Sequence, residues 1–176
     1  MFIDHLNLFN LHIKEIVLLI LLSLQLGTTS YAANHESIAI DSLPAVFMIG
    51  QNELEYEALV STCSYPLLTV CNDSMDRAYK YWMTMLSDME QHAEKSEFDI
   101  KGIKIWLNVF WNADGSIKHL VYFPKPNSRN MDFSLLTKFF KKFVTDWNMD
   151  SIGGNCYSHY GSATFPTFAD YYLRNK

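Results

Sequence analysis

The chain has 176 residues, a length typical of one domain. Its hydrophobic content of 49%, with 15% aromatic residues, excludes a disordered chain, which would lack the apolar area that offsets chain entropy. The formal net charge is −5 and no dense basic stripe is present, which argues against a nucleic-acid partner, because such proteins neutralise phosphates with clustered lysine and arginine.

The N-terminal segment has the layout of a secretory signal peptide. Lys14 precedes the uncharged run Ile16–Leu26, and Ser30 and Ala32 stand at the −3 and −1 positions of a cleavage site. The run is shorter than the ~20 residues that a membrane span needs, so we expect residues 1–32 to be a cleaved signal peptide. An uncleaved anchor is the alternative, and it is the only membrane contact that we expect. The predicted location is therefore periplasmic or secreted.

Three cysteines follow this segment: Cys63, Cys71 and Cys156. Export makes a disulfide chemically permissible. Cys63 and Cys71 flank a short loop that contains Tyr65 and Pro66, so we prefer this pair. Cys156 is then left over as a thiol, although it could instead pair with either of the other two.

Residues 33–45 are expected to form a short linker and residues 46–176 a single domain. Its first elements are a short strand, Val46–Ile49, and a helix, Glu53–Val60. The strongest helical pattern is Asp73–Lys95, in which Asp73 caps the first turn. The spacing of three and four predicts one buried face, made of Met75, Tyr79, Trp82, Leu86, Met89 and Ala93.

A long β-hairpin follows. Ile103–Trp111 alternates, with the odd-numbered side chains on an apolar face and Lys104, Trp106, Asn108 and Phe110 on the other. Asn112–Gly115 contains an Asp-Gly pair that suits a tight turn. The returning strand, Ser116–Phe123, is expected to place on one face Ile117, His119, Val121 and Phe123.

Pro124 and Pro126 stop the sheet, because proline cannot donate to the ladder. Asp132 then caps a second helix, Phe133–Trp147, and a last strand is expected over Ala163–Leu173, interrupted at Pro166. This order of elements predicts an α+β domain, an antiparallel sheet with two helices packed on one face.

Two pairs of residues near the C-terminus could carry hydrolytic chemistry. Cys156 with His159 would make a thiolate–imidazolium pair, and Ser158 with His159 would be part of a triad. The sequence has no G-x-S-x-G elbow, no second ligand pair for a zinc site and no Gly-rich phosphate loop. We therefore predict no catalytic residues, no metal and no cofactor, and keep an exported hydrolase as an alternative.

The hairpin carries the pattern Gly102-Ile103-x-Ile105-x-Leu107-x-Val109, followed by Asn112-Ala113-Asp114-Gly115-Ser116-Ile117. This pattern resembles the G-x-V-x-V-x-F-x-V-D-x-D-G-x-I hairpin of TonB C-terminal domains. The helix and terminal aromatic segment come in the same order as in that family, so the resemblance covers about residues 100–174. It implies a non-catalytic domain that binds a protein or peptide partner in the cell envelope, by addition of a strand at an exposed sheet edge.

We expect the partner to contact the last strand and the outward aromatic side chains of the hairpin. The candidate residues are Trp106, Phe110, Tyr122, Thr164, Phe165, Thr167 and Phe168. A small-ligand-binding α+β module, in which the long helix leaves a pocket on the sheet, is a second alternative.

Overall fold

The computed structural model of the protein describes residues 42–174. The predicted signal peptide and most of the predicted linker lie outside the described residues. Within residues 42–174 no helix is both long and apolar enough to cross a membrane.

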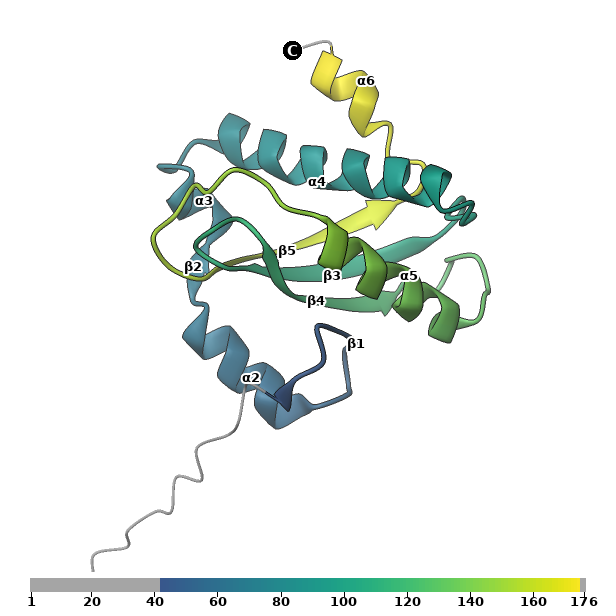
Figure 1. Ribbon diagram of the computed structural model, residues 1–176, viewed down its shortest axis with the longest axis horizontal. Coiled ribbons are helices and arrows are strands. Elements are labelled where there is room, and N and C mark those ends of the chain that lie inside the picture. The colour runs from purple at the N-terminus through teal and green to yellow at the C-terminus, as the bar shows by residue number, and fades with distance from the viewer. Residues whose placement is uncertain (1–41, 175–176) are drawn as a thin grey trace, which may run out of the picture. The chain divides into compact units, whose positions relative to one another are not determined.

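A five-stranded sheet forms the centre of the domain, with strand order β1-β4-β3-β5-β2 (Figure 1). Its strands are β1 (Val46–Met48), β2 (Tyr65–Pro66), β3 (Lys104–Trp111), β4 (Ile117–Pro124) and β5 (Tyr157–Thr164). The three long strands pair antiparallel, whereas β1 pairs parallel with β4 and β2 pairs parallel with β5. The prediction of a purely antiparallel sheet is therefore wrong. Both short edge strands are separated from their partners by helical connections, which permit parallel pairing.

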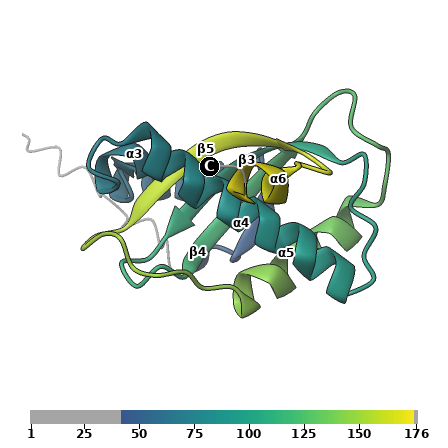
Figure 2. The ribbon, with the colours of Figure 1, turned by 90° about the horizontal axis from the view of Figure 1, so that it is seen from above.

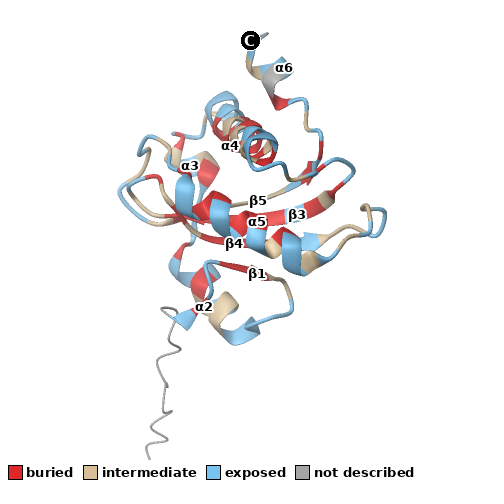
Figure 3. Ribbon diagram, turned by 45° about the vertical axis from the view of Figure 1, so that its right-hand side comes forward, coloured by how far each residue is buried: buried red, intermediate tan, exposed pale blue. Residues whose placement is uncertain are grey.

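The helices of the described residues are α2 (Glu53–Thr62), α3 (Leu67–Val70), α4 (Met75–Lys95), α5 (Phe133–Asp146) and α6 (Ala169–Arg174). The two long helices, α4 and α5, cover one face of the sheet, and α2 lies against the opposite face (Figures 1 and 3). The α+β class and the placement of two helices on one face are thus confirmed.

The main core lies between the sheet and the two long helices. The odd-numbered side chains of β3 enter it and are fully buried, as the alternation predicted: Ile105, Leu107, Val109 and Trp111. Burial of each such side chain contributes about 1.5–3 kcal/mol to the free energy of unfolding.

The β3–β4 pairing contains an irregularity between Phe110 and Trp111. Val109 pairs with Leu120, yet Trp111 pairs with Ile117, so β4 has one extra residue at its start. As a result Ile117 packs in the main core, while Val121 belongs to the smaller cluster beneath α2. The prediction that Ile117 shares a face with Val121 is wrong, because a bulge reverses the side-chain alternation at that point.

The N-cap of helix α4 lies one residue later than predicted. Ser74, not Asp73, is the N-cap, and its Oγ accepts a hydrogen bond from the Arg77 N–H at 3.3 Å. Asp73 has a φ of 55°, in the left-handed region, and belongs to the preceding turn. The first two residues of the predicted buried face of α4 are not buried, since Met75 is 70% exposed and Tyr79 is 41% exposed.

The C-terminal region differs most from the prediction. The last strand is Tyr157–Thr164, and residues 169–174 form α6 rather than a continued strand. In β5 the side chains that face the main core are small at Gly161 and Ala163, so an apolar strand pattern is missing from the sequence. Gly161 leaves room for the Trp82 ring, because a Cβ at residue 161 would lie 2.8 Å from Cζ2 of Trp82.

Candidate functional site

Strand β5 has one open edge. Along its whole length it pairs with β3, from Tyr157 opposite Trp111 to Thr164 opposite Lys104. On its other side only Tyr157 and Ser158 have partners, in β2. From residue 159 onward β5 therefore forms the rim of the sheet, and no other strand among residues 42–174 pairs with it there (Figure 2).

Backbone alternation shows which groups are available at this rim. The Phe165 N–H donates to Ile103 O at 2.9 Å, so residue 165 and the odd-numbered residues before it direct their backbone groups toward β3. The even-numbered residues Tyr160, Ser162 and Thr164 direct theirs outward. We call the outer side of residues 159–164 the free edge of β5.

Proline ends the strand that would otherwise cover this edge. Pro66, opposite Ser158, has no N–H to donate, and the chain then turns away into α3. The short β2 thus protects the start of β5 and leaves the rest open.

The opposite rim of the sheet is much less accessible to an added strand. Strand β1 has three residues, and the N–H of Met48 already donates to Oε1 of Gln51 at 3.2 Å. A short strand whose outward donor is occupied is a common protection against edge pairing. An added strand can therefore pair with β5 more readily than with β1.

Beside the free edge, the sheet surface that faces away from α4 and α5 is aromatic and exposed. Trp106 and Tyr160 stack, with ring centroids 5.7 Å apart and an interplanar angle of 11°. Nζ of Lys125 lies 4.2 Å from the centroid of the Trp106 ring. Trp106, Phe123 and Tyr160 are 39%, 45% and 55% exposed. We call the surface formed by these residues, with Lys104, the open face.

Helix α2 covers the remaining part of the same sheet surface. Phe110 and Val121 are buried there against Leu59 and its neighbours. At the boundary Asn108 donates through Nδ2 to the hydroxyl of Tyr56 at 2.9 Å. The open face therefore ends where α2 begins.

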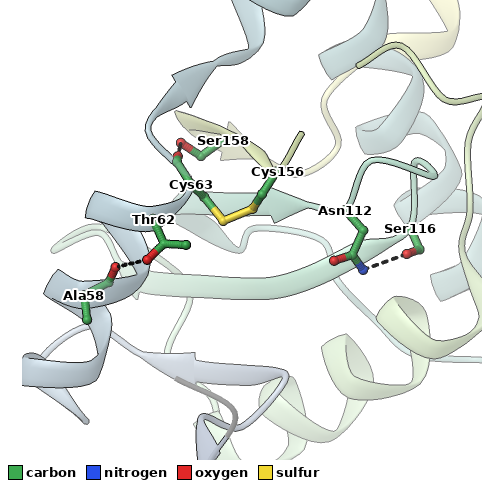
Figure 4. The surroundings of a disulfide bond; sticks show 7 residues. All are labelled: Ala58, Thr62, Cys63, Asn112, Ser116, Cys156 and Ser158. Atoms are coloured by element: carbon green, nitrogen blue, oxygen red, sulfur yellow. Dashed lines mark hydrogen bonds between the residues drawn. A yellow bond between two sulfur atoms is a disulfide. The ribbon is translucent and has the colours of Figure 1, made fainter. Parts of the chain in front are cut away.

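A disulfide holds the C-terminal end of α2 to the segment that enters β5 (Figure 4). It joins Cys63 to Cys156, and the nearby Ser158 Oγ donates to Cys63 O at 3.2 Å. A disulfide is thus present, but the preferred Cys63–Cys71 pairing is wrong. The residues between those two cysteines form β2 and α3, which carry Cys71 into the main core while Cys63 lies in the cluster beneath α2. Cys71 is a free buried thiol, and its burial raises its pKa.

The predicted partner-binding residues fall into three groups. Trp106 and Thr164 lie at the open face and the free edge. Three others are at most 1% exposed, so they support the fold instead: Phe110, Tyr122 and Phe165. Tyr122 faces the helices, where its hydroxyl pairs with Oγ1 of Thr137 at 2.6 Å, so the expectation that it points outward is wrong.

The other two, Thr167 and Phe168, lie beyond the free edge. Oγ1 of Thr167 donates to Oε2 of Glu90 in α4 at 2.8 Å. Phe168 is 67% exposed and lines a cavity of about 560 Å³ between α4 and α6. These residues are therefore separate from the open face.

Sequence reasoning missed four residues of this site: Lys104, Phe123, Lys125 and Tyr160. Phe123 was placed on the correct face of β4, and the hairpin register would have set it beside Trp106. Tyr160 lies before the last strand that the sequence predicts, Ala163–Leu173, so the sequence gives no indication of its place in the sheet.

The hydrolytic pairs are not assembled. The sulfur of Cys156 is in the disulfide and is no nucleophile. Ser158 faces the α2 side of the sheet, whereas the His159 ring packs on Trp82 of α4, with centroids 4.7 Å apart. Adjacent strand residues point to opposite faces, so the two side chains cannot work together. Burial lowers the pKa of His159, which keeps the ring neutral.

Residues 42–174 contain no group of three or more His, Cys, Asp or Glu side chains that could hold a metal ion. No family model, curated protein or solved structure matches the chain.

Proposed function

We propose that this chain is an exported, non-catalytic domain that binds a protein or peptide partner, which adds a strand to the free edge of β5. One observation carries the proposal: within the part of the chain that the structure describes, no strand lies beside the outward backbone groups of Tyr160, Ser162 and Thr164. An extended segment there would gain several backbone hydrogen bonds, each contributing about 0.5–1.5 kcal/mol.

The open face supports the same mode of binding. Alternate side chains of an added strand would project on the side of Tyr160, whose ring is more than half exposed. Aromatic side chains contribute large contact area at interfaces. Backbone bonds would then supply affinity and the open face would supply selectivity.

The resemblance of the hairpin to TonB C-terminal domains favours this function, since that family implies strand addition to a partner. The Cys63–Cys156 disulfide fits an exported protein, because such bonds persist in oxidising compartments. We infer a partner in the cell envelope on these grounds.

Replacement of Ser162 tests strand addition directly. Ser162→Pro removes an outward N–H while leaving the β3–β5 ladder intact, since proline is tolerated where the N–H faces away from the sheet. Ser162→Ala keeps that N–H and serves as the matched control. The full chain is used to capture proteins from a cell-envelope extract.

We expect wild type and Ser162→Ala to retain the same partner and Ser162→Pro to bind it at least tenfold more weakly, with an unchanged circular dichroism spectrum. Equal binding by Ser162→Pro would overturn the proposal.

A further inference from the structure

The sheet carries no carboxylate. None of the residues in β1 to β5 is Asp or Glu, although the chain as a whole has 19 acidic and 14 basic residues. The open face instead carries two lysines, Lys104 and Lys125. The strands of the open face therefore carry lysines and no carboxylate, although the chain as a whole is acidic.

Both lysines are held in place through their backbones. The Lys125 N–H donates to Lys104 O at 2.9 Å, and the Lys104 N–H donates to Ser128 Oγ at 2.9 Å. Lys125 covers the ring of Trp106. Among residues 42–174 the salt bridges are Arg129–Asp99 and Lys142–Asp146, so neither lysine of the open face has a carboxylate partner.

Lys104 is well placed to meet a strand added to β5. It lies directly opposite Thr164, on the same side of the sheet. An added strand would run about 10 Å from the Lys104 backbone, two strand spacings away. The combined length of a lysine and a glutamate side chain covers that distance.

Docking of a strand beside Thr164 would remove water from the Lys104 ammonium group, the nearer of the two lysines. An ion that loses water without gaining a counter-ion opposes binding, whereas a carboxylate of the partner restores the interaction. Tyr160, further along β5, has no charged neighbour on the paired strands and suits an apolar side chain.

We propose that the partner segment is an acidic extended peptide, with a carboxylate side chain beside Thr164 and an apolar side chain beside Tyr160. This inference rests on the proposed strand addition and adds the chemistry of the partner. A second copy of this chain fits less well, because its own free edge would bring lysines and no sheet carboxylate against the same lysines.

Selection from a random dodecapeptide phage library on the full chain tests the proposal. Three proteins are compared: wild type, Lys104→Glu/Lys125→Glu, and Lys138→Glu/Lys141→Glu, whose lysines are exposed on α5. We expect peptides selected by wild type and by the α5 variant to be at least threefold enriched in Asp and Glu. The open-face variant should lose this enrichment and favour Lys and Arg.

The strongest selected peptide is then synthesised with and without N-methyl groups at alternate backbone positions, and its binding is followed by fluorescence anisotropy. We expect N-methylation to abolish binding in one of the two registers, the one whose N–H groups face β5. Carboxylate enrichment with binding that survives N-methylation in both registers would leave the acidic preference standing and overturn strand addition.

Binding that is lost on N-methylation, from peptides without carboxylate enrichment, would leave strand addition standing and overturn the acidic partner. Failure to select any peptide, together with Lys104-dependent binding to phosphatidylglycerol vesicles, would overturn the acidic peptide in favour of a membrane surface.

Discussion

The indole ring of Trp106 and the phenol ring of Tyr160 stack diagonally across β3 and β5. Both residues are exposed, yet each is held by the other at the centre of the open face. Such diagonal pairs on a sheet lie within reach of aromatic side chains. The open face therefore has an ordered aromatic centre rather than two independent rings.

This stacking predicts a measurable coupling. Trp106→Ala and Tyr160→Ala, singly and together, are compared by urea unfolding. We expect a coupling free energy of about 0.5–1.5 kcal/mol. Trp106→Ala combined with Leu135→Ala on α5 is the control, and its effects should add. If the losses in free energy of unfolding from Trp106→Ala and Tyr160→Ala simply add in the double variant, the stacked arrangement is contradicted.

The disulfide closes a large loop, because its cysteines are 93 residues apart in sequence. We expect Cys63→Ala/Cys156→Ala to lower the free energy of unfolding by about 2–5 kcal/mol. Cys71→Ala is the control for loss of a cysteine and should leave the bridge in place. Mass spectrometry of alkylated protein checks the pairing: because trypsin leaves Cys63 and Cys71 in one peptide that ends at Arg77, an internal bridge in that peptide together with an alkylated Cys156 would refute it.

Gly161 is expected to tolerate no side chain. Gly161→Ala places a Cβ against the Trp82 ring, and we expect a loss of about 1–3 kcal/mol in stability with a changed near-ultraviolet circular dichroism signal. Gly154→Ala is the matched control, because a Cβ there meets nothing within 4 Å. Similar melting temperatures for the two variants would show that Trp82 does not pack on β5 as described.

Acid is expected to destabilise the fold through His119. This side chain is 5% exposed, and its Nδ1 lies 3.1 Å from Pro44 O. Burial lowers its pKa below 6.5, so as pH falls below about 6.5 the unfolded chain binds a proton that the folded chain does not. Stability is therefore fully present above that pH and decreases below it, by at most about 1.4 kcal/mol per pH unit.

His119→Asn tests this assignment, because asparagine can still donate to Pro44 O but does not titrate. Urea unfolding between pH 7 and pH 5 should show a shallower loss of stability in the variant. His92 and His159 also have pKa values lowered by burial, so the stability of the variant still depends in part on pH. An unchanged slope in His119→Asn would assign the effect to those two residues.

The parts of the fold that follow a single local pattern could be predicted. The alternation of Ile105 to Trp111 identified β3 and its buried face, and the Asp-Gly pair located the turn, where Asp114 Oδ1 accepts from the Ser116 N–H at 2.9 Å. Asp132 was also recognised as a cap, and it accepts from the Ser134 N–H at 2.8 Å. In each case neighbouring residues alone determine the structure.

The remaining features depend on distant residues. The bulge at Phe110 and Trp111 arises from pairing with β4. The small size of Gly161 in β5 is explained only by the Trp82 ring of α4, which packs against it in the folded protein. The free edge exists because β2 ends at Pro66, about ninety residues earlier in the chain than Ser158. No window of sequence contains these relationships, so the candidate site was found only in part.

The position of Cys71 affects how the Cys63–Cys156 disulfide forms. In an unfolded chain the nearby thiols of Cys63 and Cys71 meet far more often than Cys63 and Cys156, because closing a short loop costs less entropy. For a chain oxidised as it emerges into an oxidising compartment, we expect the eight-residue bridge to form first, before residue 156 is present. Packing of α3 against α4 then removes Cys71 from competition, so a chain exported as proposed would have to exchange that first bridge for the Cys63–Cys156 bridge.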